Sequence, residues 1–359
     1  MRILHVITTL DTGGAERLMV DLLPLLKDKG DFVELLVFNG FMTPFRKELE
    51  ERGVRIHELA INEKGGEVYD PLHIFRLHKY MKGFDIIHTH NTACQLYVPI
   101  AKALFNSSAK LVTTDHSTTS HRRDYRWFRP IEKWMYRQYD EIVCIGDMSL
   151  DNLQQYLSKD GHACVVYNGV NTKLFIRPIK DISRQDSFVI TMVAGLRVEK
   201  DHDTLIKSIA HLPSNYRLKM VGSGQREQQL KTLCRELNLR DRVDFMGARM
   251  DVPEILEQSD VIVLSSHWEG LSLSSIEGMA SGRPFIASDV DGLREMVGGV
   301  GVLFPHGDDV ALAKKIQWLC EHPDEYREIA QRCQEKARQY DISVTASKYL
   351  KLYEELLQS

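Results

Sequence analysis

Two carboxylates with seven residues between them, Glu269 and Glu277, are the clearest chemical feature of this chain. The apolar run 261–264 predicts a strand that is buried on both faces of a parallel sheet. A helix is expected to begin near Ser274 and to end at Gly282. The intervening loop would lie at the carboxyl end of a strand, where doubly wound proteins bind ligands. The helix terminus offers free N–H groups to a phosphate, and each carboxylate can accept hydrogen bonds from hydroxyls. A nucleotide-sugar has this layout.

A purely structural interpretation of Glu277 also exists. The order Ser274, Ser275, Ile276, Glu277 fits a capping box, in which the glutamate bonds back to the helix start. The local pattern leaves the two interpretations open. Glu269 has no comparable structural explanation, and a strand-end loop of this kind usually carries function.

Two cations follow the expected strand 188–194. Cleavage of a sugar–diphosphate bond leaves negative charge on the departing phosphate, and Arg197 and Lys200 could stabilise that charge without a metal. The alternative is a solvated charge run with Glu199, because protein surfaces are charged by default.

Glycine pairs join strands to helices at two places. Gly13 and Gly14 let the backbone come close to a bound group and leave a helix N-terminus uncovered, and Gly222 and Gly224 are a weaker signal of the same type. Neither is a G-x-G-x-x-G fingerprint, and the second strand ends near Asn39 rather than at an acidic residue, which disfavours a dinucleotide dehydrogenase. A turn with only a steric role is the alternative.

Histidines and an acidic pair raise the question of a metal. His116 ends a strand and is a candidate sugar contact or charge stabiliser. His88 and His90 alternate onto one face of a neighbouring strand, but no carboxylate or cysteine completes an evident ligand set with them. Asp289 and Asp291 imitate an Asp-x-Asp metal motif, although capping of the following helix explains them better. We therefore predict no metal site.

Residues 121–139 interleave basic and aromatic side chains. This pattern fits a surface that contacts an anionic membrane. It also fits a helix whose Trp134 and Tyr136 pack inward while its basic residues face water, and this second interpretation is slightly favoured.

The elements that position these residues can be predicted from the order of apolar segments. The chain alternates strands with helices, which predicts parallel sheets with right-handed crossovers. At 359 residues it is too long for one comfortable core. We expect an N-terminal Rossmann-like domain at 1–170, a polar linker at 171–187, a second Rossmann-like domain at 188–340 and a C-terminal helix at 341–359. Strands are expected at 2–10, 32–38, 54–59, 85–90, 110–116, 141–145, 165–167, 188–194, 217–221, 243–246, 261–265, 284–288 and 301–304.

Composition limits the class of protein. The chain is 43% hydrophobic and 27% charged, as in an ordinary soluble globular protein, and a net charge of −4 argues against a nucleic-acid binder. Six scattered cysteines with no C-x-x-C pair fit a reduced, cytoplasmic protein. No stretch approaches the length needed to cross a bilayer, and the first apolar run resembles a strand rather than a signal peptide.

The motifs GGAER at 13–17, LVTTDHS at 111–117, AGLRVEK at 194–200, VGSG at 221–224 and the Glu269–Glu277 segment resemble, in order and spacing, the family-4 retaining glycosyltransferases of the GT-B fold (glycosyl transferases group 1). The resemblance spans nearly the whole chain. It implies two doubly wound parallel-sheet domains that face a central cleft, with a C-terminal helix crossing back to the first domain.

The resemblance also implies roles for individual residues. Arg197 and Lys200 would hold the diphosphate, Glu269 would contact the donor sugar, Glu277 would contact the ribose, and His116 would face the sugar. Many members of the family place the arginine directly after the strand-ending glycine, whereas here Leu196 intervenes between Gly195 and Arg197. The remaining donor-binding positions would be the backbone of Gly270, Leu271, Ser272, Leu273 and Ser274, together with Gly13 and Gly14.

The function so implied is a retaining, metal-independent transfer of a hexose or N-acetylhexosamine. The donor would be a nucleoside-diphosphate sugar, most often UDP-linked, and the acceptor a free or lipid-linked carbohydrate in polysaccharide or glycolipid synthesis. No cofactor is expected. Membrane contact would be peripheral, at the inner face. Two alternatives remain open: a sugar-nucleotide epimerase of the same fold, and a non-catalytic nucleotide-sugar-binding protein.

Overall fold

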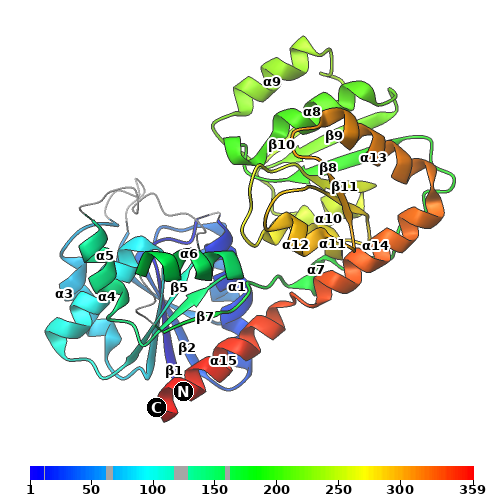
Figure 1. Ribbon diagram of the computed structural model, residues 1–359. Coiled ribbons are helices and arrows are strands. Elements are labelled where there is room, and N and C mark those ends of the chain that lie inside the picture. Colours follow the sequence, from blue (N-terminus) through cyan, green and yellow to red (C-terminus); the bar gives the residue numbers. More distant parts are fainter. Residues whose placement is uncertain (12, 62–67, 117–127, 158–161) are drawn as a thin grey trace. The chain divides into compact units, whose positions relative to one another are not determined.

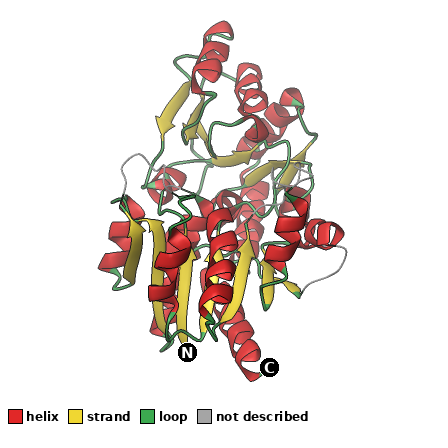
Figure 2. Cartoon of the chain, turned by 90° about the vertical axis from the view of Figure 1, so that its left-hand side faces the viewer, coloured by secondary structure: helices red, strands yellow, loops and turns green. Residues whose placement is uncertain are grey.

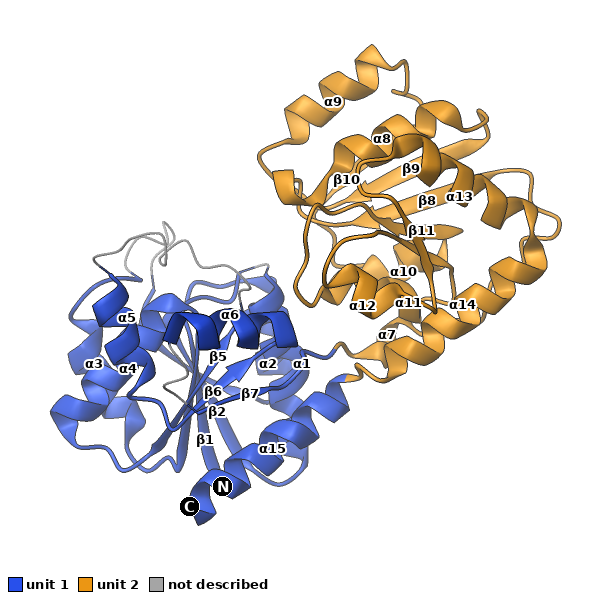
Figure 3. Cartoon of the chain, viewed as in Figure 1, with its two compact units in different colours: residues 1–169, 342–359 blue, residues 170–341 orange. Residues whose placement is uncertain are grey.

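The computed structural model describes residues 1–11, 13–61, 68–116, 128–157 and 162–359. The chain divides into two compact units, which are coloured separately in Figure 3. Unit 1 comprises Met1–Gly169 and Ile342–Ser359, and unit 2 comprises Val170–Asp341. The polar segment 171–187 therefore belongs to unit 2, and the last helix of the chain belongs to unit 1.

Unit 1 is built on a seven-stranded parallel sheet with strand order β3-β2-β1-β4-β5-β6-β7. Helices pack around this sheet (Figures 1 and 2). Its core strands are continuous apolar runs because helices cover both faces of the sheet. Alternate residues of β1 enter two separate clusters, Ile3 and Ile7 on one face and Leu4 and Val6 on the other. The strands are β1 (Arg2–Ile7), β2 (Phe32–Asn39), β3 (Arg55–Ala60), β4 (Ile86–His90), β5 (Lys110–Asp115), β6 (Glu141–Cys144) and β7 (Ala163–Val165).

Helices follow the strands of unit 1 in alternation, as a doubly wound sheet requires. They are α1 (Gly14–Asp28), α2 (Pro44–Glu51), α3 (His73–Met81), α4 (Thr92–Phe105), α5 (Arg129–Tyr136), α6 (Asp147–Leu157) and the C-terminal α15 (Ile342–Gln358).

Helix α15 is fastened to the sheet of unit 1 by buried tyrosines. The hydroxyl of Tyr353 lies 2.6 Å from Nδ1 of His88, and the hydroxyl of Tyr349 lies 3.1 Å from Oγ1 of Thr114. Both tyrosines are fully buried. A buried phenol needs a partner for its hydroxyl. These hydrogen bonds therefore fix the position of the helix on the sheet, in addition to the burial of apolar surface.

Unit 2 has a six-stranded parallel sheet with strand order β10-β9-β8-β11-β12-β13. The strands are β8 (Phe188–Val193), β9 (Tyr216–Val221), β10 (Val243–Gly247), β11 (Val261–Leu264), β12 (Phe285–Ser288) and β13 (Val302–Phe304). The helices are α7 (Thr172–Phe175), the 3-10 turn η2 (Val198–Lys200), α8 (His202–His211), α9 (Glu227–Glu236), α10 (Val252–Glu257), α11 (Leu273–Ala280), α12 (Leu293–Val297), α13 (Asp309–Glu321) and α14 (Pro323–Arg338).

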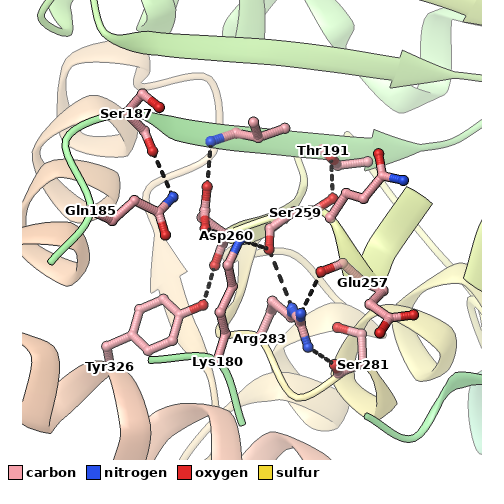
Figure 4. Close-up of polar contacts among 12 residues, drawn as sticks. Lys180, Gln185, Ser187, Thr191, Glu257, Ser259, Asp260, Ser281, Arg283 and Tyr326 are labelled. Carbon is pink, nitrogen blue, oxygen red and sulfur yellow. Dashed lines mark hydrogen bonds and ion pairs between the residues drawn. The ribbon is translucent and has the colours of Figure 1, made fainter. Parts of the chain in front are cut away.

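A buried polar network holds the segment before β8 against the amino ends of the strands (Figure 4). Lys180 Nζ lies 2.6 Å from Oδ1 of the fully buried Asp260, whose other oxygen accepts from the N–H of Val189 at 2.6 Å. The guanidinium of Arg283 donates only to backbone carbonyls, among them those of Pro178 and Ser259. Parallel sheets bind ligands at the opposite edge, so this network is structural.

Candidate active site

The helix that separates the two glutamates is capped by Ser272, not by Ser274. The Ser272 side chain accepts from the N–H of Ser275 at 3.4 Å, and α11 begins at Leu273. Glu277 is therefore the fifth residue of the helix, whereas a capping box requires the glutamate at the third. The capping-box interpretation of Glu277 is wrong, because the serine run starts the helix earlier than expected.

Glu269 and Lys200 form an ion pair beside the amino end of α11. Nζ of Lys200 lies 2.5 Å from Oε1 of Glu269, and the two side chains are only 14% and 8% exposed. The hydroxyl of Ser266 donates to the same carboxylate oxygen at 2.6 Å. Lys200 and Glu269 follow β8 and β11, which are neighbours in the second sheet, and they meet in one partly desolvated charge pair. Electrostatic interactions are stronger there than in water.

Three backbone contacts hold the loops around this pair. The hydroxyl of Ser265, at the end of β11, donates to the carbonyl of Asp201 at 2.8 Å and so joins that strand to η2. The hydroxyl of Ser288, at the end of β12, donates to the carbonyl of Ser266 at 2.6 Å. Gly292 has a φ of +81°, and a Cβ there would come within 2.3 Å of the Glu269 carbonyl. The Glu269 loop is thus positioned by strand ends rather than by its own sequence.

Arg197 lies apart from the ion pair. Its side chain is 63% exposed, and its Nε lies 3.0 Å from Oε1 of Glu199. This exposed pair with Glu199 fits the solvated charge run that is the alternative interpretation of the segment. The role of Arg197 at the phosphate stays a prediction.

The glycines of the VGSG motif allow close packing against the loop that carries Arg197. A Cβ on Gly222 would lie 2.1 Å from the carbonyl oxygen of Ala194, and one on Gly224 would lie 2.4 Å from that of Leu196. Gly222 also has a φ of +139°. These glycines let the chain after β9 pack against the chain after β8, which supports the backbone that leads to Arg197.

In unit 1, the two glycines at the start of α1 lie close in the chain to a carboxylate, Glu16. Gly13 is extended at the helix N-cap, and a Cβ there would meet the side chain of Glu16. Asn91, which follows β4, donates to Oε1 of Glu16 at 3.3 Å, and burial raises the pKa of the Glu16 carboxyl. Gly14 is the first residue of α1. The donor-binding role of both glycines stays a prediction.

His116 follows β5 and ends a row of hydrogen-bonded imidazoles. His90 Nδ1 lies 2.9 Å from Nε2 of His116, and His90 Nε2 lies 3.0 Å from Nδ1 of His5. Burial lowers the pKa of His116 to about 4 and that of His5 to about 3, and it lowers the pKa of His90 well below its usual value. All three rings are therefore neutral near pH 7, and each tautomer is set by its neighbour because a neutral ring has one donor and one acceptor.

The nitrogens of His88 and His90 already have partners within unit 1. His88 bonds to the hydroxyls of Tyr353 and Thr114 at 2.6 and 2.7 Å, and His90 bonds to the two histidines beside it. The acidic pair in unit 2 is likewise engaged, because Arg294 bonds to Asp289 at 2.5 Å and to Asp291 at 2.9 Å. Neither acidic side chain caps α12, whose N-cap is Gly292, so that expectation is wrong.

Two aromatic side chains of helix α5 differ in burial, which the sequence did not decide. Tyr136 is 2% exposed, as the inward-packing interpretation requires, but Trp134 is 40% exposed. The first part of the basic-aromatic segment, 121–127, lies outside the described residues.

Several polar residues near these loops escaped the sequence analysis. His5 gives no signal within an apolar strand, because its partners come from the pairing of β1 with β4. Glu16 lies within the motif GGAER, and nothing in the motif indicates its contact with Asn91. Asp201, His267 and His306 converge from three loops of unit 2, and no sequence spacing connects them.

Two family models together account for most of the chain. The model for Glycosyltransferase Family 4 matches residues 12–174, and the model for Glycosyl transferases group 1 matches residues 177–340. The chain belongs to this glycosyltransferase family. It is a glycosyltransferase of the GT-B fold, as the motifs and the two parallel sheets predicted.

Curated relatives share its length as well as its fold. The chain is 26% identical to the putative glycosyltransferase EpsD of Bacillus subtilis, with 88% of this chain and 93% of the relative covered. It is 23% identical, over 99% of both chains, to a Campylobacter jejuni alpha-1,4-N-acetyl-D-galactosaminyltransferase whose name gives a PP-undecaprenol-linked acceptor.

Solved structures confirm the fold of this glycosyltransferase. Anabaena Alr3699/HepE in complex with UDP and glucose superposes with a TM-score of 0.84 at 22% identity, over 99% of this chain and 100% of that chain. Sucrose-phosphate synthase from Thermosynechococcus elongatus gives a TM-score of 0.79 at 23% identity over the full length of both. In the described part of this glycosyltransferase, no helix is long and apolar enough to cross a membrane.

Proposed function

We propose that this glycosyltransferase transfers a hexose or N-acetylhexosamine from a UDP-sugar to a sugar-containing acceptor with retention of configuration and without a metal. The observation that carries this proposal is the Lys200–Glu269 ion pair, at 2.5 Å beside the amino end of α11. A diphosphate and a sugar hydroxyl are the two groups that such a cation and anion would bind.

When the donor binds, its diphosphate would contact Lys200 and its sugar would contact Glu269. A diphosphate oxygen would replace Glu269 as the partner of Lys200, and the carboxylate would then accept hydrogen bonds from the sugar. The backbone of Gly270–Ser274 would support the phosphate, since the first N–H groups of α11 lack partners within the helix. Glu277, one turn further along, would accept from the ribose. Each charge would thus exchange one partner for another, which limits the desolvation cost of binding.

In the reaction itself, the bond between the anomeric carbon and the phosphate oxygen breaks, and both of its electrons leave with the UDP. The acceptor oxygen attacks from the same face, and its proton passes to the departing phosphate oxygen. Lys200 and Arg197 would stabilise the charge that grows on that phosphate. The neutral His116 would face the sugar with its outward nitrogen. This assignment needs no covalent nucleophile on the protein.

The acceptor side of the proposal rests on α5 and on the relatives. Exposed Ile131 and Trp134 lie among Arg129, Lys133 and Arg137, a combination that suits contact with an anionic bilayer. The Campylobacter relative is named for a lipid-linked acceptor. We therefore include peripheral contact with the inner membrane face and a lipid-linked carbohydrate acceptor in the proposal.

Replacement of Lys200 tests the proposed mechanism. Lys200→Ala should lower turnover by about a hundred- to a thousandfold, the usual effect of losing one preorganised charge, while UDP-sugar binding weakens far less. Lys314→Ala, on the exposed face of α13, is the matched control and should retain parental turnover. Turnover near the parental rate in Lys200→Ala, with an intact circular dichroism spectrum, would show that the lysine is not catalytic.

A further inference from the structure

A second polar cluster of unit 2 lies beside the Lys200–Glu269 pair but is not part of it. His267 precedes Glu269 in the loop after β11, Asp201 follows Lys200, and His306 follows β13. One nitrogen of each histidine and one carboxylate oxygen of Asp201 lie within 4.8 Å of one another. His267 Nδ1 lies 2.6 Å from Nε2 of His306 and 3.8 Å from Oδ2 of Asp201.

The carboxylate of this cluster is fixed in place. Asp201 is 4% exposed, and its Oδ2 accepts from the hydroxyl of Thr204 at 2.6 Å, while its Oδ1 accepts from the N–H of the same residue at 3.3 Å. Each carboxylate oxygen has two lone pairs, so Oδ2 keeps one for a further partner. A hydrogen bond to the carboxylate is also the kind of outer contact that orients metal ligands.

The two histidines come from different strand ends and meet at right angles. Their ring planes are 89° apart, and the backbone N–H of His267 donates to the carbonyl of Glu199 at 2.8 Å, which fixes that residue. His306 is exposed, so its ring can turn without disturbing the core. Two imidazole nitrogens and a carboxylate oxygen that lie this close together are a donor set that one cation could bind.

We propose that Asp201, His267 and His306 bind a divalent transition-metal ion, with Zn²⁺ as the best match. Two imidazoles and one carboxylate with an open position is a donor set that Zn²⁺ prefers, and that Mg²⁺ does not. Two ligand nitrogens on one tetrahedral Zn²⁺ stand about 3.3 Å apart, given bonds of about 2.0–2.1 Å. Rotation of the exposed His306 ring would open the 2.6 Å contact to this value.

Such an ion would connect the loops after β8, β11 and β13. The first two of these loops carry Lys200 and Glu269, so the ion would hold the donor-binding loops together without touching the donor. The proposed ion would not replace Lys200 and Arg197, the cations that we assign to the leaving group. It rests on its own ligand geometry and stands whether or not the proposed transfer reaction is correct.

Metal binding can be measured directly on the full chain. Calorimetry with Zn²⁺ alone should give one site per chain, and Mg²⁺ at the same concentration should give none. Co²⁺ should bind with the visible absorption of a tetrahedral site. His306→Ala should weaken Zn²⁺ binding by at least about tenfold, since even loss of an outer-shell partner typically costs 10- to 100-fold.

Two further variants make the test specific. His211→Ala removes an exposed histidine that also pairs with a carboxylate, Asp309, and should leave Zn²⁺ affinity at the parental value. His306→Cys keeps a ligand at this position, so its Co²⁺ form should gain the near-ultraviolet sulfur-to-metal absorption that only a coordinated thiolate produces. The same circular dichroism spectrum in all metal-free variants excludes misfolding.

The proposal fails if the parental chain binds neither Zn²⁺ nor Co²⁺. It also fails if His306→Ala binds Zn²⁺ as tightly as the parent, which would locate any bound ion elsewhere, or if Co²⁺-loaded His306→Cys lacks the thiolate band.

Discussion

Glu269 and Glu277 differ in their surroundings. Glu269 is buried in an ion pair with Lys200, whereas Glu277 lies on the first turns of α11, past the residues that cap it. The sequence predicted that both glutamates and Lys200 belong to one region. It could not predict that Glu269 and Lys200 bond to each other, because they are 69 positions apart and three strands, β9, β10 and β11, lie between them in the sequence.

Glu277→Gln separates a ligand role from a structural one. If the carboxylate accepts from the ribose, Glu277→Gln should weaken UDP binding, as measured by calorimetry. Ser272→Ala is the contrasting variant and should lower the free energy of unfolding by about 1 kcal/mol, the usual cost of a lost cap. Unchanged UDP affinity in Glu277→Gln would remove the ribose contact from the account.

The buried histidines of β1 and β4, together with His116 after β5, make the stability of unit 1 depend on pH. The folded-state pKa values of about 3 for His5 and about 4 for His116 lie below the ordinary value of 6.5. Below pH 6.5 the unfolded chain therefore binds more protons than the folded chain, so the free energy of unfolding falls as the pH is lowered toward 4. Above pH 6.5 these rings are neutral in both states and contribute no slope.

Chemical unfolding at pH 7, 6 and 5 measures this effect. His5→Leu removes one of the titrating rings and should make the fall in stability shallower than in the parent. Equal slopes for the parent and His5→Leu would mean that the imidazole at this position is not held neutral by burial.

Helix α5 carries the membrane proposal. If Trp134 and its basic neighbours contact a bilayer, the protein should sediment with anionic vesicles at low salt and be released at high salt, since screening weakens the attraction of Lys and Arg. Trp134→Ser should reduce the bound fraction. Trp318→Ser, which replaces a similarly exposed tryptophan on α13, should not. Absence of vesicle binding at low salt would remove membrane contact from the proposed function.

For the whole molecule, apolar periodicity was enough to predict both parallel sheets, and every expected strand is present within a few residues of its predicted bounds. Apolar periodicity did not predict the long-range polar contacts. The segment 171–187 looked like a free linker, yet Lys180 is held by the buried Asp260, and Pro178 accepts from Arg283. The row from His5 to His116 likewise depends on strand order, which no single strand encodes.

The configuration of the product tests the central claim most directly. The protein would be incubated with a panel of UDP-sugars and free or lipid-linked sugar acceptors in the presence of EDTA, and the products analysed by mass spectrometry and proton NMR. We predict an acceptor extended by one sugar, joined through the same anomeric configuration as the donor. An inverted linkage, an epimerised UDP-sugar formed without acceptor, or loss of all activity in the chelator that added Mn²⁺ or Mg²⁺ restores would contradict the account.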